Sequence, residues 1–156
     1  MPFFSKHFRR SEAPWEVVDC GDITPVPMWD EEDGIEVLRL LENDISFEFK
    51  HELRRIVDLR KAVLFARQQL MQDASGLGFN ILLMEGWQYT LLRKGNRYRL
   101  DVVYRGRPAY AAGKITPQPP PPFLDVLDRC KQQMHGFVPT SASSSAVRIS
   151  KARIVV

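Results

Sequence analysis

Three cations near a predicted hairpin turn, Lys94, Arg97 and Arg99, are the side chains of this sequence best suited to binding chemistry. Side chains alternate along a strand, which puts all three on the outer face of the predicted sheet. Tyr110 is expected nearby. Guanidinium and ammonium groups beside an aromatic ring suit contacts with phosphates and stacking on bases. The pattern predicts a site for nucleic acid or another anion, although arginine-rich outer faces also arise simply because they favour solubility.

A second candidate site is the proline-rich segment 117–122. Lys114 lies three residues before Pro117, and Pro120 follows three residues after it. This is the form of one class of SH3 ligand, in which a preformed polyproline helix carries an orienting charge. The alternative interpretation is a stiff linker that positions a short helix expected over residues 123–134.

The third candidate is an extended N-terminal arm, residues 1–33. Residues 11–33 contain eight acids and no bases, and prolines block regular helix in this part of the chain. Trp15, Met28 and Trp29 supply the large apolar anchors with which such an arm docks in a basic, apolar groove. That groove belongs either to another protein or to the basic sheet of the same chain, which would attract the acids around 30–33.

No short motif indicates catalysis or metal binding. The three histidines and two cysteines show no ligand spacing, and neither a phosphate loop nor a nucleophile elbow is present. The acidic clusters fall in the proline-containing arm, where nothing holds two carboxylates as a fixed pair. We therefore expect no catalytic residue, no metal and no cofactor. An enzyme without a recognisable motif remains the third hypothesis for the function.

The elements that position these residues centre on a hairpin. The dipeptide Gly95-Asn96 separates two strand-like runs and suits a two-residue turn. That turn sets Lys94 opposite Arg97 and Leu91 opposite Leu100. The face expected to be buried consists of Trp87, Tyr89, Leu91, Tyr98, Leu100, Val102 and Tyr104. Residues 80–84 are expected to form a further strand, and Glu85-Gly86 is either a tight turn into Trp87 or a bulge within one long strand. A last short strand is expected over 108–113, after a turn at 105–107.

Two helices are predicted before the hairpin. Apolar residues at three- and four-residue steps predict a long amphipathic helix over 46–74. A shorter helix is expected to start near Gly34, because Asp33 and Glu36 have the spacing of a capping box. The predicted fold is α+β: a three- to four-stranded antiparallel meander with the long helix packed on one face.

Composition and charge complete the expectations. The chain has 156 residues, 44% of them hydrophobic, which suffices for one domain over 34–135, between the arm and a serine-rich tail at 136–156 expected to be disordered. No apolar run is long enough to span a membrane, and no signal peptide is recognisable. With two isolated cysteines, the expected location is intracellular, cytoplasmic or nuclear.

The predicted function is a small non-enzymatic module that binds another protein; the alternative is a domain that binds RNA or another polyanion through its basic face.

Overall fold

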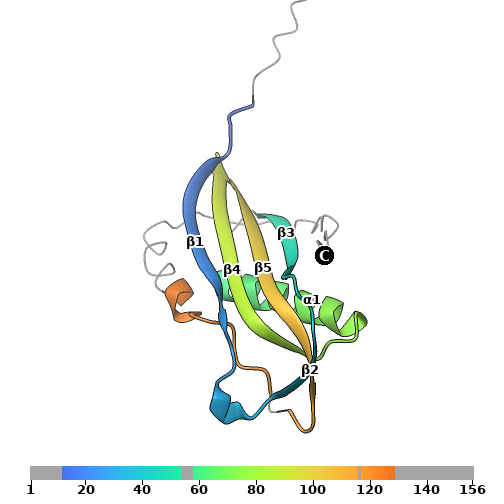
Figure 1. The fold of residues 1–156 in the computed structure, drawn as a ribbon. Helices are drawn as coiled ribbons and strands as arrows, with labels where there is room; N and C mark the ends of the chain where they lie inside the picture. Colours follow the sequence, from blue (N-terminus) through green and yellow to red (C-terminus); the bar gives the residue numbers. More distant parts are fainter. Residues whose placement is uncertain (1–11, 54–57, 116, 129–156) are drawn as a thin grey trace, which may run out of the picture.

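The structure, a computed structural model, describes residues 12–53, 58–115 and 117–128. In chain order the elements are β1 (Glu16–Pro27), the 3-10 helix η1 (Glu31–Asp33), β2 (Glu36–Leu40), β3 (Ile45–Leu53), α1 (Leu59–Gly76), β4 (Ile81–Lys94) and β5 (Arg97–Ala112) (Figure 1). All pairings are antiparallel: β1 pairs with β4, β4 with β5, and the far edge of β5 pairs with both β3 and β2. The predicted antiparallel sheet with a helix packed on it is confirmed. The predicted count of three to four strands is too low, because the described part of the chain forms five.

The central hairpin has the predicted register. Lys94 pairs with Arg97 and Leu91 with Leu100, and Gly95 adopts the positive φ of 61° that the turn requires. Residues 81–94 form the single strand β4, with a register shift between Leu82 and Met84, so the alternative of one long bulged strand is the correct one. The turn expected at 105–107 and the separate strand expected at 108–113 are wrong, because β5 runs without a break over 16 residues.

Gly86, within β4, marks a close approach of the backbone rather than a turn. A Cβ atom there would lie 2.5 Å from the carbonyl oxygen of Ile23 and 2.6 Å from the nitrogen of Pro25, where the register of β1 shifts against β4. Glycine therefore allows the bulged edge strand β1 to approach the backbone of β4 closely.

The long helix predicted over 46–74 is wrong in its first part. Residues 45–53 form β3, and α1 begins at Leu59 after Asp58, whose side chain accepts hydrogen bonds from the backbone N–H groups of Arg60 and Lys61. Ile45 and Phe47 are buried whereas Glu48 is exposed, which is the period of a strand. The outer edge of β5 supplies the hydrogen-bonding partner that makes this segment a strand.

The helix expected near Gly34 is also wrong. Gly34, with a φ of 60°, ends η1, and the capping contact joins Asp33 to the backbone N–H of Asp30 instead of to Glu36. Residues 36–40 form β2 on the edge of β5. Much of the predicted arm is likewise part of the sheet, because residues 16–27 form the edge strand β1.

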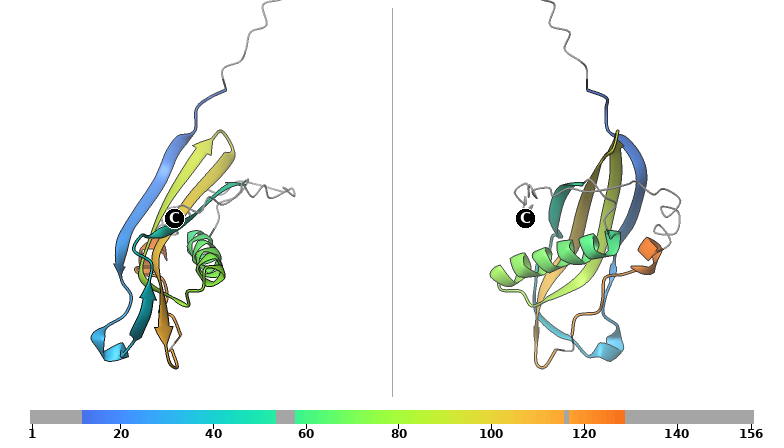
Figure 2. Two further views of the ribbon diagram at one scale, coloured as in Figure 1. Left: turned by 45° about the vertical axis from the view of Figure 1, so that its right-hand side comes forward. Right: turned by 180° about the vertical axis from the view of Figure 1, so that it is seen from behind.

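One face of the sheet carries the core and the other faces outward. Figure 2 shows α1 lying across a single face of the sheet, with no described helix on the opposite face. Trp87, Tyr89 and Leu100 are at most 2% exposed and share one cluster with Val63 and Leu70 of α1. The predicted aromatic face is thus the buried one, although Tyr98 is only partly buried.

Near the C-terminal end of the described chain, residues 122–124 form a turn and residues 125–128 are helical, so the helix expected from residue 123 begins two residues later. Residues 129–134 of that helix and the tail at 136–156 lie outside the described residues. In the part of the chain that the structure describes, no helix has the length and apolar character needed to cross a membrane.

Candidate interaction surfaces

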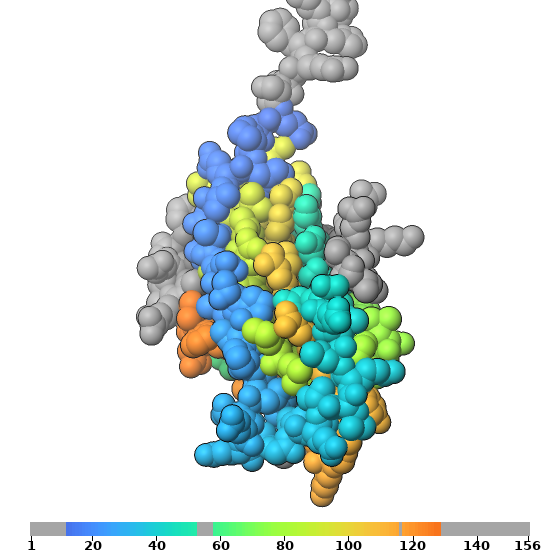
Figure 3. Space-filling view, viewed as in Figure 1, coloured from blue at the N-terminus to red at the C-terminus, as the bar shows by residue number. Residues whose placement is uncertain are grey.

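The predicted anion-binding cations come together on the outer face at the turn of the β4–β5 hairpin. Lys94 Nζ lies 6.0 Å from the centroid of the Trp15 ring, and the guanidinium carbons of Arg97 and Arg99 lie 5.9 and 5.3 Å from it. These are cation–π distances. Figure 3 shows the first described residues of the chain, drawn in blue, against the end of the hairpin. The three cations, which we call the hairpin cluster, therefore have an aromatic residue of their own chain over them.

Each cation of the hairpin cluster also has an acidic partner. Glu12 Oε2 lies 2.7 Å from Lys94 Nζ, Arg97 pairs with Glu52 of β3, and Arg99 makes two hydrogen bonds of 2.9 and 3.0 Å to Asp101. The hydrogen bond and charge of Lys94 hold the pKa of Glu12 below its ordinary value. The hairpin cluster is consequently neutralised within its own chain.

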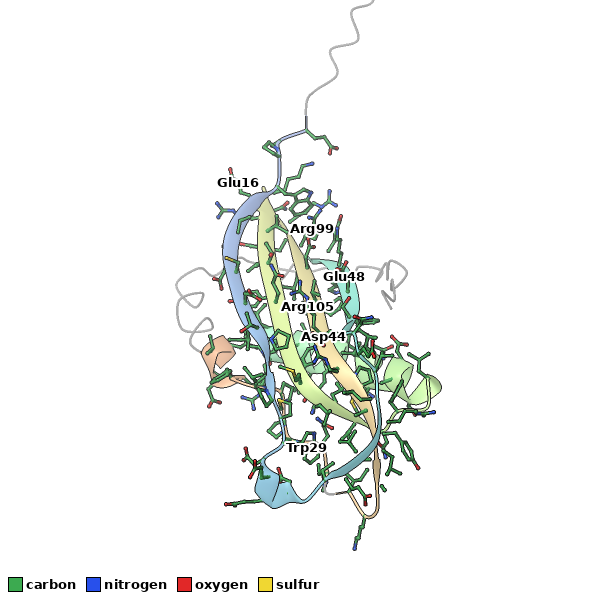
Figure 4. The ribbon with its side chains drawn as sticks, viewed as in Figure 1. Glu16, Trp29, Asp44, Glu48, Arg99 and Arg105 are labelled. Carbon is green, nitrogen blue, oxygen red and sulfur yellow. The ribbon has the colours of Figure 1, made fainter. Side chains whose placement is uncertain are left out.

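The rest of the outer face mixes charges of both signs. Figure 4 shows Arg99, Arg105, Asp44 and Glu48 along this face. Arg107 pairs with Asp44 at 2.8 Å, while Arg105 is exposed. Tyr110, predicted beside the basic residues, lies instead where β5 pairs with β2, with the Arg39 guanidinium 5.7 Å from its ring centroid. The outer face, predicted from sequence to be largely basic, thus carries acidic side chains beside the basic ones.

Met28 and Trp29, the other predicted anchors, contact the chain's own domain. Trp29 Nε1 donates a 3.0 Å hydrogen bond to the carbonyl of Leu82, and the ring packs against the small cluster of Ile81, Ala109 and Ala111. The backbone N–H of Met28 donates to Leu83 O. Trp29 and Arg99 lie toward opposite ends of the sheet (Figure 4), so the acids beside Trp29 are remote from the hairpin cluster.

The proline-rich segment is held against the core by side chains from α1 and β4. Gln118 Nε2 donates to Leu82 O at 2.9 Å, and Gln118 Oε1 accepts from Leu82 N at 3.2 Å, so its amide pairs with β4 as a neighbouring strand would. Trp87 Nε1 donates to Pro122 O at 2.8 Å, and Arg67 donates to Pro119 O. These bonds fix the segment at both of its ends.

A buried carboxylate, Glu85, joins this segment to the core. It has no exposed surface, and it accepts hydrogen bonds from Arg67 Nε at 2.6 Å, Tyr104 Oη at 3.0 Å and Gln118 Nε2 at 3.1 Å. Burial, followed by the Glu85 charge, raises the pKa of Tyr104. A buried charge needs such complete pairing, so we assign Glu85 to holding α1, the hairpin and the proline-rich segment together.

Sequence reasoning missed Glu85, Arg67 and Gln118. The available signal was one acid inside the apolar run from Ile81 to Trp87, because a charge at such a position must find a partner when the run is buried.

Exposure along the proline-rich segment recurs every third residue. Lys114, Pro117 and Pro120 are exposed, whereas Gln118 is half-buried and Pro121 is buried. Three residues is the period of a polyproline II helix. The three residues singled out from the sequence as an SH3-type ligand are therefore the ones that face solvent.

No group of three or more histidine, cysteine or acidic side chains in the described ranges is placed to hold a metal ion. The chain matches no family model, and no curated protein or solved structure is significantly similar to it.

Proposed function

We propose that this protein is an interaction module that presents its proline-rich segment, with Lys114, Pro117 and Pro120 as contact residues, to a polyproline-binding domain of another protein. The observation that carries this proposal is the exposure at every third residue of a segment whose intervening positions are attached to the core.

Attachment to the core leaves one edge of the segment, the edge with both contact prolines, free for such a partner. A polyproline II helix has three edges, because it has three residues per turn. A groove that takes Pro117 and Pro120, each with the residue before it, contacts two of these edges. The third edge contains Gln118, which bonds to β4, and Pro121, which is buried. Arg67 and Trp87 bond to the carbonyls of Pro119 and Pro122 on a second, half-buried edge. The edge that contains Pro117 and Pro120 faces solvent.

The attachment also favours binding energetically. A ligand that is already ordered loses less conformational entropy when it binds, which is the advantage of preorganisation. Gln118, Arg67 and Trp87 provide that order here. The exposed ammonium of Lys114 supplies the charge that sets the direction of the segment in a groove.

Binding to a panel of purified SH3, WW and EVH1 domains, measured by calorimetry with the full chain, tests this function. We expect an SH3 domain to bind, and the double variant Pro117→Ala/Pro120→Ala to lose roughly tenfold or more in affinity. The matched control is Pro14→Ala/Pro27→Ala, which alters two exposed prolines elsewhere in the chain. We expect that control to bind like the wild type.

A synthetic peptide of residues 112–124 distinguishes a presented ligand from a linker. If the segment is preorganised for binding, the full chain binds more tightly than the peptide. If the peptide binds and the full chain does not, the segment is occluded and serves as a structural linker, which contradicts the proposal. Absence of binding by every domain in the panel contradicts it as well.

A further inference from the structure

The residues that cover the hairpin cluster supply two chemical groups to it. Trp15 places a flat aromatic ring against all three cations, and Glu12, three residues earlier, places a carboxylate 2.7 Å from Lys94 Nζ. A nucleotide of a single strand supplies the same pair of groups, a flat base and an anionic phosphate. We infer that the hairpin cluster is a binding site for single-stranded nucleic acid, which Glu12 and Trp15 fill within their own chain.

The geometry of the cluster follows from the hairpin. Lys94 and Arg97 are paired directly across the turn, and Arg99 follows two residues later on the same face. Three cations from two strands thus converge on one position, with Arg99 nearest to the ring at 5.3 Å. A guanidinium group next to a ring that it can stack on is the arrangement by which proteins bind unpaired bases.

Removal of Glu12 leaves the cluster with excess positive charge. Lys94 then loses its acidic partner, while Arg97 and Arg99 keep Glu52 and Asp101. The side chains of Arg97 and Glu52 are 54% and 55% exposed, so this ion pair is weak and a phosphate can compete for the cation. The site can therefore accept an anion once the N-terminal residues are displaced.

A single strand fits this position better than a duplex does. Stacking on the cluster needs a base whose face is accessible, and the bases of a duplex are stacked on one another. A duplex or heparin offers the cluster only its charged groups. Tighter binding of the single strand than of the duplex or heparin would therefore indicate that a base stacks on the cluster.

The experiment uses the full-length double variant Glu12→Gln/Trp15→Ala and a fluorescein-labelled single-stranded DNA of roughly 12 nucleotides. Because the N-terminal residues compete with the ligand, we expect the variant to bind about tenfold or more tightly than the wild type, with an affinity that falls as salt rises. The matched control Glu31→Gln makes the same change in net charge at an exposed acid of η1 and should leave affinity at the wild-type level. We call Glu12→Gln/Trp15→Ala the open variant. Adding Arg97→Gln/Arg99→Gln to it should abolish the gain in DNA affinity, with circular dichroism confirming the fold.

Three outcomes overturn the inference. No gain in the open variant means that the cluster is no site for a nucleic acid. Equal affinity for the single strand, its duplex and heparin means that only charge is recognised and that no base stacks on the cluster. Binding of a peptide of residues 10–18 by the open variant, without binding of DNA, means that the cluster is a peptide site.

Discussion

Replacement of Arg67 by methionine tests whether the Glu85 network holds the structure together. The variant keeps most of the aliphatic stem on α1 but removes the two hydrogen bonds, of 2.6 and 3.0 Å, that Arg67 makes to Glu85. It leaves a carboxylate with no exposed surface and only Tyr104 and Gln118 as hydrogen-bond donors. Removing one partner of a buried ion pair costs about 3–5 kcal/mol, a large share of a typical unfolding free energy.

Urea unfolding, followed by circular dichroism, measures this loss. Glu85→Gln should lower the unfolding free energy by less than Arg67→Met does. The Arg67 side chain that it leaves unpaired is 14% exposed and so reaches water, and the new amide can still bond to Tyr104 and Gln118. The double variant Arg67→Met/Glu85→Gln should cost less than the sum of the two single changes, since no buried charge is then left unpaired. If Arg67→Met is too unstable to measure, Arg67→Lys retains the charge while losing the two-pronged contact, and it should fall between the wild type and Arg67→Met.

The reasoning is refuted if Arg67→Met lowers the unfolding free energy by less than about 1 kcal/mol, the range of an exposed ion pair. Additive costs in the double variant would refute it too, because they would show that Arg67 and Glu85 do not act as a pair. Hydrogen exchange gives a local check: the amide of Leu82, which donates to Gln118, should exchange faster in Arg67→Met as the proline-rich segment loosens.

Three further predictions concern the sheet and its charges. Gly86→Ala forces a methyl group onto the backbone of β1, 2.5 Å from Ile23 O, and should lower the unfolding free energy by about 1–3 kcal/mol, whereas Gly76→Ala, with open space around it, should not destabilise in the same urea assay. The pKa of Tyr104 is raised in the folded state, so its protonated hydroxyl contributes fully to the unfolding free energy below the pKa of an unfolded tyrosine, near 10. Above that pH the unfolding free energy should fall by up to about 1.4 kcal/mol per pH unit, and this loss in alkali should be smaller in Tyr104→Phe. The pKa of Glu12 is lowered, so its contact with Lys94 is present above the ordinary value of 4.5 and is lost as the pH falls below it; the indole N–H resonance of Trp15 should shift in that acid range in the wild type and stay fixed in Glu12→Gln.

Local signals in the sequence determined the central hairpin. The dipeptide Gly95-Asn96 fixes the turn, and the alternation of apolar and polar residues on both sides, broken by Leu92 and Val103, assigns Leu91 and Leu100 to the buried face. Both the turn geometry and the two-residue period depend on neighbouring residues alone, so no knowledge of the remaining chain was needed.

Tertiary contacts decided the segments whose local pattern fits two structures. The apolar residues of 45–53 satisfy both the alternation of a strand and, with those that follow, the steps of a helix. The unpaired edge of β5 selects the strand, since pairing satisfies the backbone of both. The partners of Glu85 were equally inaccessible to sequence reasoning, because Arg67 is 18 residues away and Gln118 is 33 residues away.

For the candidate sites too, the sequence determined one part and the tertiary structure the other. The sequence alone placed Lys94, Arg97 and Arg99 on one face, and it indicated that an acidic arm would be attracted to them. Only the tertiary structure decided which part of the arm lies there. Because β1 runs antiparallel to β4, with Glu16 opposite Arg93 and Pro27 opposite Met84, its beginning lies at the hairpin turn and its end at the opposite end of the hairpin. Glu12 and Trp15 therefore cover the three cations, and the acids at 30–33 are held away from them.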